Sequence, residues 1–119
     1  MRIVVAGWLR YAGDMQTCNE IILGAREHIL ASRAETGCAA YTWAVDPLEP
    51  GVIQVFEEWD SEVDLLRHFQ DPSYAAMRDH LGQWEITGFG VQLYSAAGIE
   101  PVYDENGVAR REIFGVSLA

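Results

Sequence analysis

Residues 52–74, VIQVFEEWDSEVDLLRHFQDPSY, contain the change from strand to helix that decides the fold of this chain. The first part alternates, and a strand would place these residues on one face: Ile53, Val55, Glu57 and Trp59. Ser61 and Asp64 then have the spacing of an N-terminal capping box, which predicts the start of a helix. Asp71 and Pro72 favour the start of a second helix, with Asp71 as its N-cap. The stretch therefore predicts a strand followed by two helices.

The N-terminal third predicts a strand and one long helix. Residues 2–11 are largely apolar on both faces, which is typical of a central strand that is covered on both sides. Asp14 can cap the segment that follows. Residues 15–33 then carry one apolar stripe at helical spacing, namely Met15, Cys18, Ile22, Ala25 and Ile29. We therefore expect a single amphipathic helix that ends near Arg33.

Two more strands complete the pattern. Residues 38–45 alternate, and residues 46–51 supply a turn into the strand that follows. Residues 86–95 return to alternation. This order predicts an α+β fold, a ferredoxin-like βαββαβ sandwich with helices on one face of the sheet. Because the strands also carry apolar residues on the other face, we expect a second copy to cover it in a symmetric homodimer.

The chain is predicted to divide near residue 98. Residues 1–98 would form the ferredoxin-like domain, and residues 99–119 would form a C-terminal extension. Residues 105–107, Glu-Asn-Gly, are a tight-turn signal between residues 101–103 and 111–114. The extension is therefore expected to be an extra hairpin or an arm that reaches a neighbouring copy.

The composition excludes several classes of partner. The 119 residues include 18 acidic side chains against 8 from Lys and Arg, which gives a net charge of −10, and all eight are Arg. Phosphate binding relies on clustered Lys and Arg, so we expect no nucleic-acid partner and no anionic membrane surface. No run reaches the roughly 18 apolar residues of a membrane span, and the N-terminus carries no secretory cleavage signal. We therefore expect a cytoplasmic protein.

The sequence has no pattern that would hold a metal or an organic cofactor. Cys18 and Cys38 have neither metal-ligand nor redox-motif spacing, and the histidines are too far apart in sequence to form a metal motif. There is no glycine-rich phosphate loop and no nucleophile elbow. We expect two free thiols and no bound metal, flavin or haem.

Five short motifs, in this order and at these spacings, resemble the antibiotic biosynthesis monooxygenase (ABM) domain family. They are Glu35-Thr36-Gly37-Cys38-Ala39-Ala40-Tyr41, Asp46-Pro47, Phe56-Glu57-Glu58-Trp59, His68 and Ser73-Tyr74. The resemblance covers residues 2–95 and implies a dimeric α+β barrel. Members of the family include oxygenases that need neither metal nor flavin, haem-degrading enzymes and a phospho-sugar isomerase, so the fold does not fix the reaction.

The resemblance differs between branches of the family. Gly7 and Arg78 stand where the haem-degrading branch has an Asn and its axial His, so haem degradation is disfavoured. The aromatic-polyketide oxygenases have an Asn and a Tyr where this chain has Val55 and Leu65, and only Trp59 matches. Oxygen chemistry is therefore implied without a polyketide substrate.

The resemblance and the local pattern together define the candidate site. His68 lies beside Phe69 at the border of an apolar stripe, where an imidazole can be held neutral and accept a proton. Trp59 and Tyr74 are expected to form walls, and Arg78 to stabilise an anionic oxygen. The other residues expected to bind the substrate are Glu57, Tyr41, Trp43 and Phe69.

Each catalytic assignment has a structural alternative. His68 could be a half-buried histidine with a satisfied hydrogen bond, and Trp59 could belong to the edge of the core. Glu57 is favoured as a buried carboxylate that caps a segment or pairs with an arginine, and Arg78 could be that partner.

The first hypothesis is a cofactor-independent monooxygenase. It would act as a homodimer on a small electron-rich aromatic or quinol-type substrate and dioxygen, and the substrate itself would supply the electrons. One alternative is a non-catalytic, small-molecule-binding or stress-associated dimer on the same scaffold. Another is an isomerase of a small polar metabolite, which would need more polar walls than the aromatic residues predict.

Overall fold

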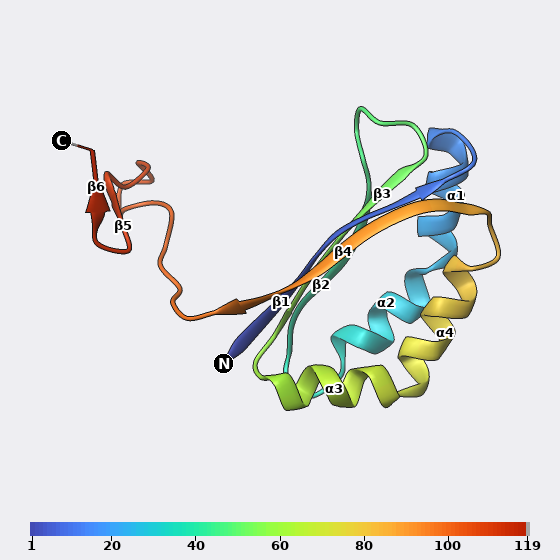
Figure 1. The fold of residues 1–119 in the computed structure, drawn as a ribbon, viewed down its shortest axis with the longest axis horizontal. Helices are drawn as coiled ribbons and strands as arrows, with labels where there is room; N and C mark the ends of the chain where they lie inside the picture. The colour runs from blue at the N-terminus through green and yellow to red at the C-terminus, as the bar shows by residue number, and fades with distance from the viewer. Residues whose placement is uncertain (119) are drawn as a thin grey trace.

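The computed structural model describes residues 1–118 and confirms the ferredoxin-like α+β architecture (Figure 1). The elements in chain order are β1 (Arg2–Tyr11), α1 (Met15–Gly24), α2 (Arg26–Arg33), β2 (Cys38–Val45), β3 (Val52–Trp59), α3 (Glu62–Gln70), α4 (Pro72–Leu81), β4 (Ile86–Ala96), β5 (Glu112–Ile113) and β6 (Val116–Ser117).

One antiparallel sheet carries the domain, with strand order β2-β3-β1-β4. Val5 of β1 lies opposite Glu57 of β3 and Leu93 of β4, so these three side chains share a face. Helices α1 to α4 all lie on that side of the sheet in Figure 1. The fully buried side chains there include Ile21, Ile53 and Trp59, each 0% exposed. The core therefore fills the layer between sheet and helices, as the alternation predicted.

The single long helix predicted over residues 15–33 is wrong, because the segment forms two helices that meet at Ala25. Helix α1 ends at Gly24, and a Cβ there would lie 2.7 Å from Cε1 of His80. The same ring donates through Nε2 to the carbonyl oxygen of Ile21 at 2.8 Å. Helix α4 thus approaches α1 closely at its C-terminal turn, and Ile21, rather than the predicted Ile22, is fully buried.

Both helix starts predicted within residues 52–74 are confirmed, and they fix the region around α3 and α4. The hydroxyl of Ser61 accepts a hydrogen bond from the backbone N–H of Asp64 at 3.2 Å. The carboxylate of Asp71 accepts one from the backbone N–H of Ser73 at 2.9 Å, with Pro72 in the first turn. The short connection places the end of α3, with His68, against the start of α4.

The C-terminal segment leaves the body after β4 and ends in a small hairpin of β5 and β6 (Figure 1). A turn at residues 104–108 is present and closes an isolated bridge between Tyr103 and Ala109. The predicted extra hairpin is therefore present, but residues 111–114 do not pair back across this turn. Glu112 pairs instead with Ser117, because Phe114 and Gly115 both have positive φ and form the hairpin turn.

The face of the sheet away from the helices is partly apolar and uncovered within the chain. Trp8, Phe56 and Tyr94 point to that side and are 38%, 46% and 51% exposed. Among residues 1–118, none of the helices has both the length and the hydropathy to cross a lipid bilayer.

Candidate functional site

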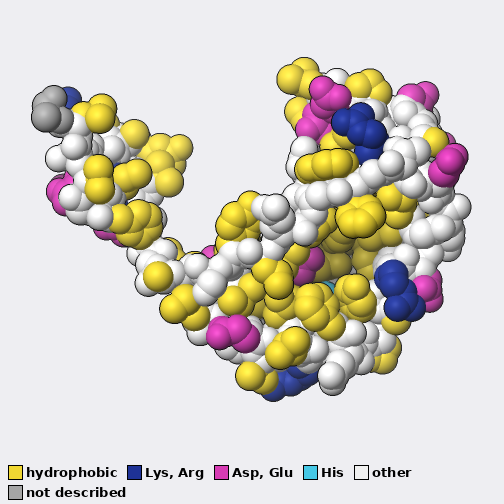
Figure 2. Space-filling model, viewed as in Figure 1, with side chains coloured by type: hydrophobic (Ala, Val, Ile, Leu, Met, Phe, Trp, Pro, Cys, Tyr) yellow, Lys and Arg dark blue, Asp and Glu magenta, His cyan; other side chains and the backbone are white. Residues whose placement is uncertain are grey.

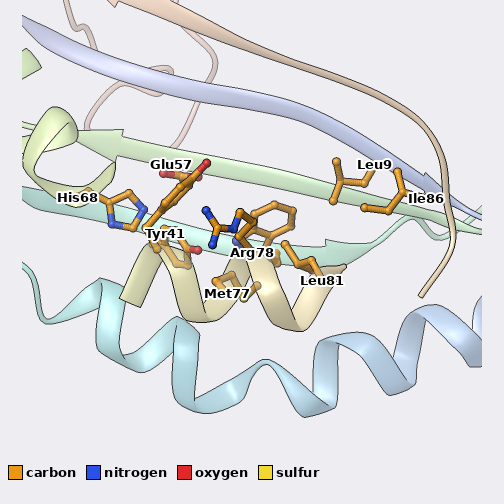
Figure 3. A pocket seen from close by; sticks show the side chains of 10 residues that line it. Leu9, Tyr41, Glu57, His68, Met77, Arg78, Leu81 and Ile86 are labelled. Carbon is orange, nitrogen blue, oxygen red and sulfur yellow. The ribbon is translucent and has the colours of Figure 1, made fainter. Parts of the chain in front are cut away.

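A cavity of about 210 Å³ lies between the sheet and helix α4. Figure 2 shows a hollow lined mainly by hydrophobic side chains in this layer. The apolar lining consists of Leu9, Trp43, Met77, Leu81 and Ile86, and the polar lining consists of Tyr41, Glu57, His68, Tyr74 and Arg78. In Figure 3 His68 and Glu57 lie at one end, and Leu9 and Ile86 lie at the other. The cavity is therefore apolar with titratable groups concentrated at one end.

Six of the eight predicted site residues line this cavity, and two do not. The six are Tyr41, Trp43, Glu57, His68, Tyr74 and Arg78. Trp59 is 0% exposed and lies behind His68, with ring centroids 4.6 Å apart, so it supports the site and forms no wall. Phe69 is 42% exposed and lines a different groove between α3 and β4. The expectations that Trp59 forms a wall and that Phe69 contributes to this cavity are therefore corrected.

The imidazole of His68 is almost fully buried, and its partner was missed from the sequence. Its Nδ1 lies 2.6 Å from Oε2 of Glu35, and the side chain is 2% exposed. The hydroxyl of Ser73 donates a hydrogen bond to the same carboxylate oxygen at 3.1 Å. Asp64, one turn before His68 in the same helix, pairs with Arg67 at 3.0 Å and is not this partner.

Aromatic rings enclose His68 on several sides. Besides Trp59, the rings of Tyr74 and Tyr41 lie at centroid distances of 5.5 and 5.8 Å, both edge-on. These contacts restrict the rotation of the imidazole, and Tyr41 and Tyr74 line the cavity together with His68. The site can therefore hold one histidine in a defined orientation at an apolar cavity.

Glu57 is a second buried carboxyl group in the cavity wall, at 7% exposure. Its Oε1 accepts a hydrogen bond from Nε1 of Trp59 at 3.0 Å. Burial raises the pKa of Glu57, and the charge of Glu35 adds to this, while the Trp59 hydrogen bond and a charged His68 oppose it. The protonated form of this carboxyl group is thus more favoured here than it is in water.

The expected pairing of Glu57 with Arg78 is absent from the described residues. The Arg78 side chain is 62% exposed and contacts Asp79 at 3.2 Å. Its long stem lets the residue line the cavity while the guanidinium stays in solvent. Arg78 is therefore a cation at the mouth of the cavity.

Tyr41 and Trp43 add hydrogen-bonding groups to the wall. Burial raises the pKa of Tyr41 to about 12, so its hydroxyl keeps its proton at neutral pH. The Nε1 of Trp43 and the Oγ of Ser32 are buried and, within residues 1–118, have no hydrogen-bond partner. In that same part of the chain no cluster of three or more potential metal ligands was found.

The chain is similar to known proteins over most of its length. The family model described as antibiotic biosynthesis monooxygenase matches residues 18–80, which is just over half of the 119 residues. A curated relative, the uncharacterized protein sll1783 of Synechocystis, is 35% identical over 72 residues, covering 60% of this chain and 48% of that protein. The chain thus spans about half the length of this relative.

Solved structures share the fold. The structure of Rv0793 from Mycobacterium tuberculosis has a TM-score of 0.68 at 22% identity and covers 85% of this chain and 100% of its own. A candidate antibiotic biosynthesis monooxygenase from Deinococcus radiodurans has a TM-score of 0.66 at 22% identity. The match covers 86% of this chain and 99% of the Deinococcus chain. At this identity the structures establish the fold, and the match to the family model establishes membership. This chain belongs to the antibiotic biosynthesis monooxygenase family.

Proposed function

We propose that the protein is a cofactor-independent monooxygenase of a small electron-rich aromatic or quinol-type substrate. The observation that carries the proposal is a carboxylate-held histidine at an apolar cavity. His68 lines the cavity, its Nδ1 is engaged by Glu35, and its Nε2 has no hydrogen-bond partner within residues 1–118. Such a nitrogen is placed to remove a proton from a bound phenol or quinol.

The cavity limits the substrate. A volume of about 210 Å³ accommodates a compact ring system, and the apolar walls favour a flat molecule with little charge. The hydroxyl of Tyr41, which keeps its proton at neutral pH, can donate a hydrogen bond to a substrate oxygen on which negative charge develops, and Glu57 can do so whenever its carboxyl group is protonated. We assign Arg78 the role of attracting an anion at the cavity mouth.

The proposed reaction requires no external reductant. His68 takes the substrate proton, and the resulting anion transfers an electron to dioxygen. Recombination forms a C–O bond and a peroxide. The O–O bond then breaks together with the remaining C–H bond at that carbon. One oxygen atom is kept as the product carbonyl, and the other leaves as water, whose two hydrogens are the proton held by His68 and the hydrogen lost from the carbon. An apolar site protects the anion from competing protonation.

Oxygen consumption tests this function directly. We expect the protein to accelerate oxygen uptake by members of a panel of small quinols and anthrones, with one labelled oxygen atom from dioxygen incorporated per product molecule. The comparison is the uncatalysed oxidation of each compound in the same buffer. If the protein accelerates none of them, or yields hydrogen peroxide without incorporating oxygen, the proposed function is wrong.

A second candidate is an isomerase that moves a proton within a small metabolite. The specific observation in its favour is that a buried carboxyl group, Glu57, and His68 line one cavity. The pair could remove a proton at one carbon and return one at another. Solvent deuterium exchange into a substrate without oxygen uptake would favour this reaction, and binding without exchange or uptake would favour the non-catalytic alternative.

We also propose that the protein acts as a homodimer through the open face of the sheet. Standard interfaces bury about 1,200 to 2,000 Å². We expect sedimentation at low micromolar concentration to give about twice the 13.3 kDa of one chain. Phe56→Glu should dissociate the dimer, whereas Leu30→Glu, at a similarly exposed site on α2, should not. A wild-type species of 13.3 kDa would refute this arrangement.

A further inference from the structure

We infer that Glu35 is a positioning residue that keeps the proton of neutral His68 on Nδ1 and leaves Nε2 as the base. The turn formed by residues 35–37 would then exist to hold this carboxylate against the imidazole. The assignment of a catalytic consequence rests on the proposed function, whereas the position of the proton does not.

The contact is short and shielded from solvent. Oε2 of Glu35 lies 2.6 Å from Nδ1 of His68, and the two side chains are 14% and 2% exposed. The hydroxyl of Ser73 donates to the same oxygen at 3.1 Å, and Asp71 holds the backbone N–H of Ser73 at the start of α4. The carboxylate is therefore fixed by a residue from each of two helices.

The turn itself can reach this place only because residue 37 is glycine. Gly37 has φ of 83°, and a Cβ at this position would lie 2.2 Å from Cγ of Asp64. Its carbonyl oxygen accepts a hydrogen bond from the backbone N–H of Asp60 at 2.8 Å. The turn is thus held beneath the first turn of α3, and Glu35 is positioned by the backbone as well as by its own hydrogen bonds.

The chemistry of the contact fixes the tautomer. An ionised carboxylate has no hydrogen to donate, so in a neutral imidazole Nδ1 must carry the proton that Glu35 accepts. The two ring nitrogens point away from each other, so Nε2 faces away from Glu35. Nε2 has no hydrogen-bond partner within residues 1–118, and His68 borders the cavity. When Nε2 takes a proton, the charge of Glu35 stabilises the imidazolium that forms.

The tautomer can be measured without any substrate. In ¹⁵N-labelled wild-type protein, at a pH where the His68 ring is neutral, we expect a protonated Nδ1 and an unprotonated Nε2, which have well-separated nitrogen shifts. Loss of one set of signals in His68→Gln assigns the ring. A wild-type spectrum with the proton on Nε2 would refute the inference before any other variant is made.

Glu35→Ala removes the acceptor. We expect the proton to move toward Nε2, the tautomer that free histidine favours, and turnover to fall by about 10- to 100-fold. KM should change little, because Glu35 does not line the cavity. Glu27→Ala, an exposed carboxylate on α2, is the matched control and should change neither the tautomer nor turnover.

The outcomes separate this inference from the proposed function. An unchanged His68 tautomer in folded Glu35→Ala would overturn the positioning role, because a merely structural glutamate would not move that proton. A wild-type Nδ1–H tautomer that shifts in Glu35→Ala would support it even if no tested compound consumed oxygen. In that case the oxygenase proposal alone would fail.

Discussion

His68→Ala is expected to lower turnover per folded molecule by about 10²- to 10⁴-fold, because the variant lacks the group assigned as general base. The variant should also lose stability, since the carboxylate of Glu35 stays largely buried without its imidazole partner. Glu35 keeps the hydrogen bond from Ser73, and loss of one partner of a buried polar group costs about 1 to 3 kcal/mol of unfolding free energy. Steady-state oxygen uptake and denaturant unfolding on one preparation measure both effects.

The chain provides a closely matched control in His80. This histidine is also buried, at 8% exposure, and it also makes a short hydrogen bond, to the carbonyl oxygen of Ile21 at 2.8 Å. It does not line the cavity that contains His68. His80→Ala should therefore lose a similar amount of stability while the folded fraction keeps full turnover. Full specific activity in a destabilised His68→Ala would remove the proposed base and most of the mechanism.

The fold could be predicted because its signals are local. Alternation around Glu57 predicted a strand, and the caps at Ser61 and Asp71 predicted two helix starts, all of which the structure confirms. The break at Ala25 could not be predicted, because it depends on how His80 packs against the C-terminal turn of α1. The apolar spacing in the sequence continues across the break, so it could not reveal a break caused by a tertiary contact.

The candidate site was predictable only in part, for a geometric reason. Phe69 follows His68 directly in a helix, and consecutive helical residues point in different directions, so both cannot face one cavity. Glu35 lies 33 positions before His68 in sequence, and no local pattern links the two. The available signals were the motif that begins at Glu35, which gave this residue no role, and the glycine at position 37, which predicts a special backbone conformation but does not identify the contacts that the turn makes.

Variants of Trp59 can test whether this residue only supports the site or also takes part in the reaction. It is fully buried, so Trp59→Ala should remove about 3 to 5 kcal/mol of unfolding free energy through lost packing. Trp59→Phe keeps one aromatic ring but removes the pyrrole part of the indole, including the N–H that donates to Glu57 at 3.0 Å. Its packing loss is smaller than that of Trp59→Ala and does not depend on pH, so the pH dependence of its stability reports the lost hydrogen bond.

The stability of Trp59→Phe should depend on pH through Glu57. The pKa of Glu57 is raised in the folded protein. Its contribution to the free energy of unfolding is therefore fully present below the ordinary carboxyl pKa, and it is lost as pH rises through the pKa that the group has in the folded protein. Without the indole N–H the ionised carboxylate is less stable still. The deficit of Trp59→Phe relative to wild type should therefore be small at acidic pH and grow as pH rises.

Unfolding in denaturant across a pH series measures this, and Glu57→Gln supplies the control. In a Glu57→Gln background no carboxyl group titrates at this position, so the deficit caused by Trp59→Phe should become nearly independent of pH. If the stability deficit still grew with pH in the Glu57→Gln background, a titrating group other than Glu57 would be responsible. If Trp59→Phe kept its stability but lost turnover, the indole would have a direct part in the reaction, because packing and the hydrogen bond to Glu57 predict the opposite ranking.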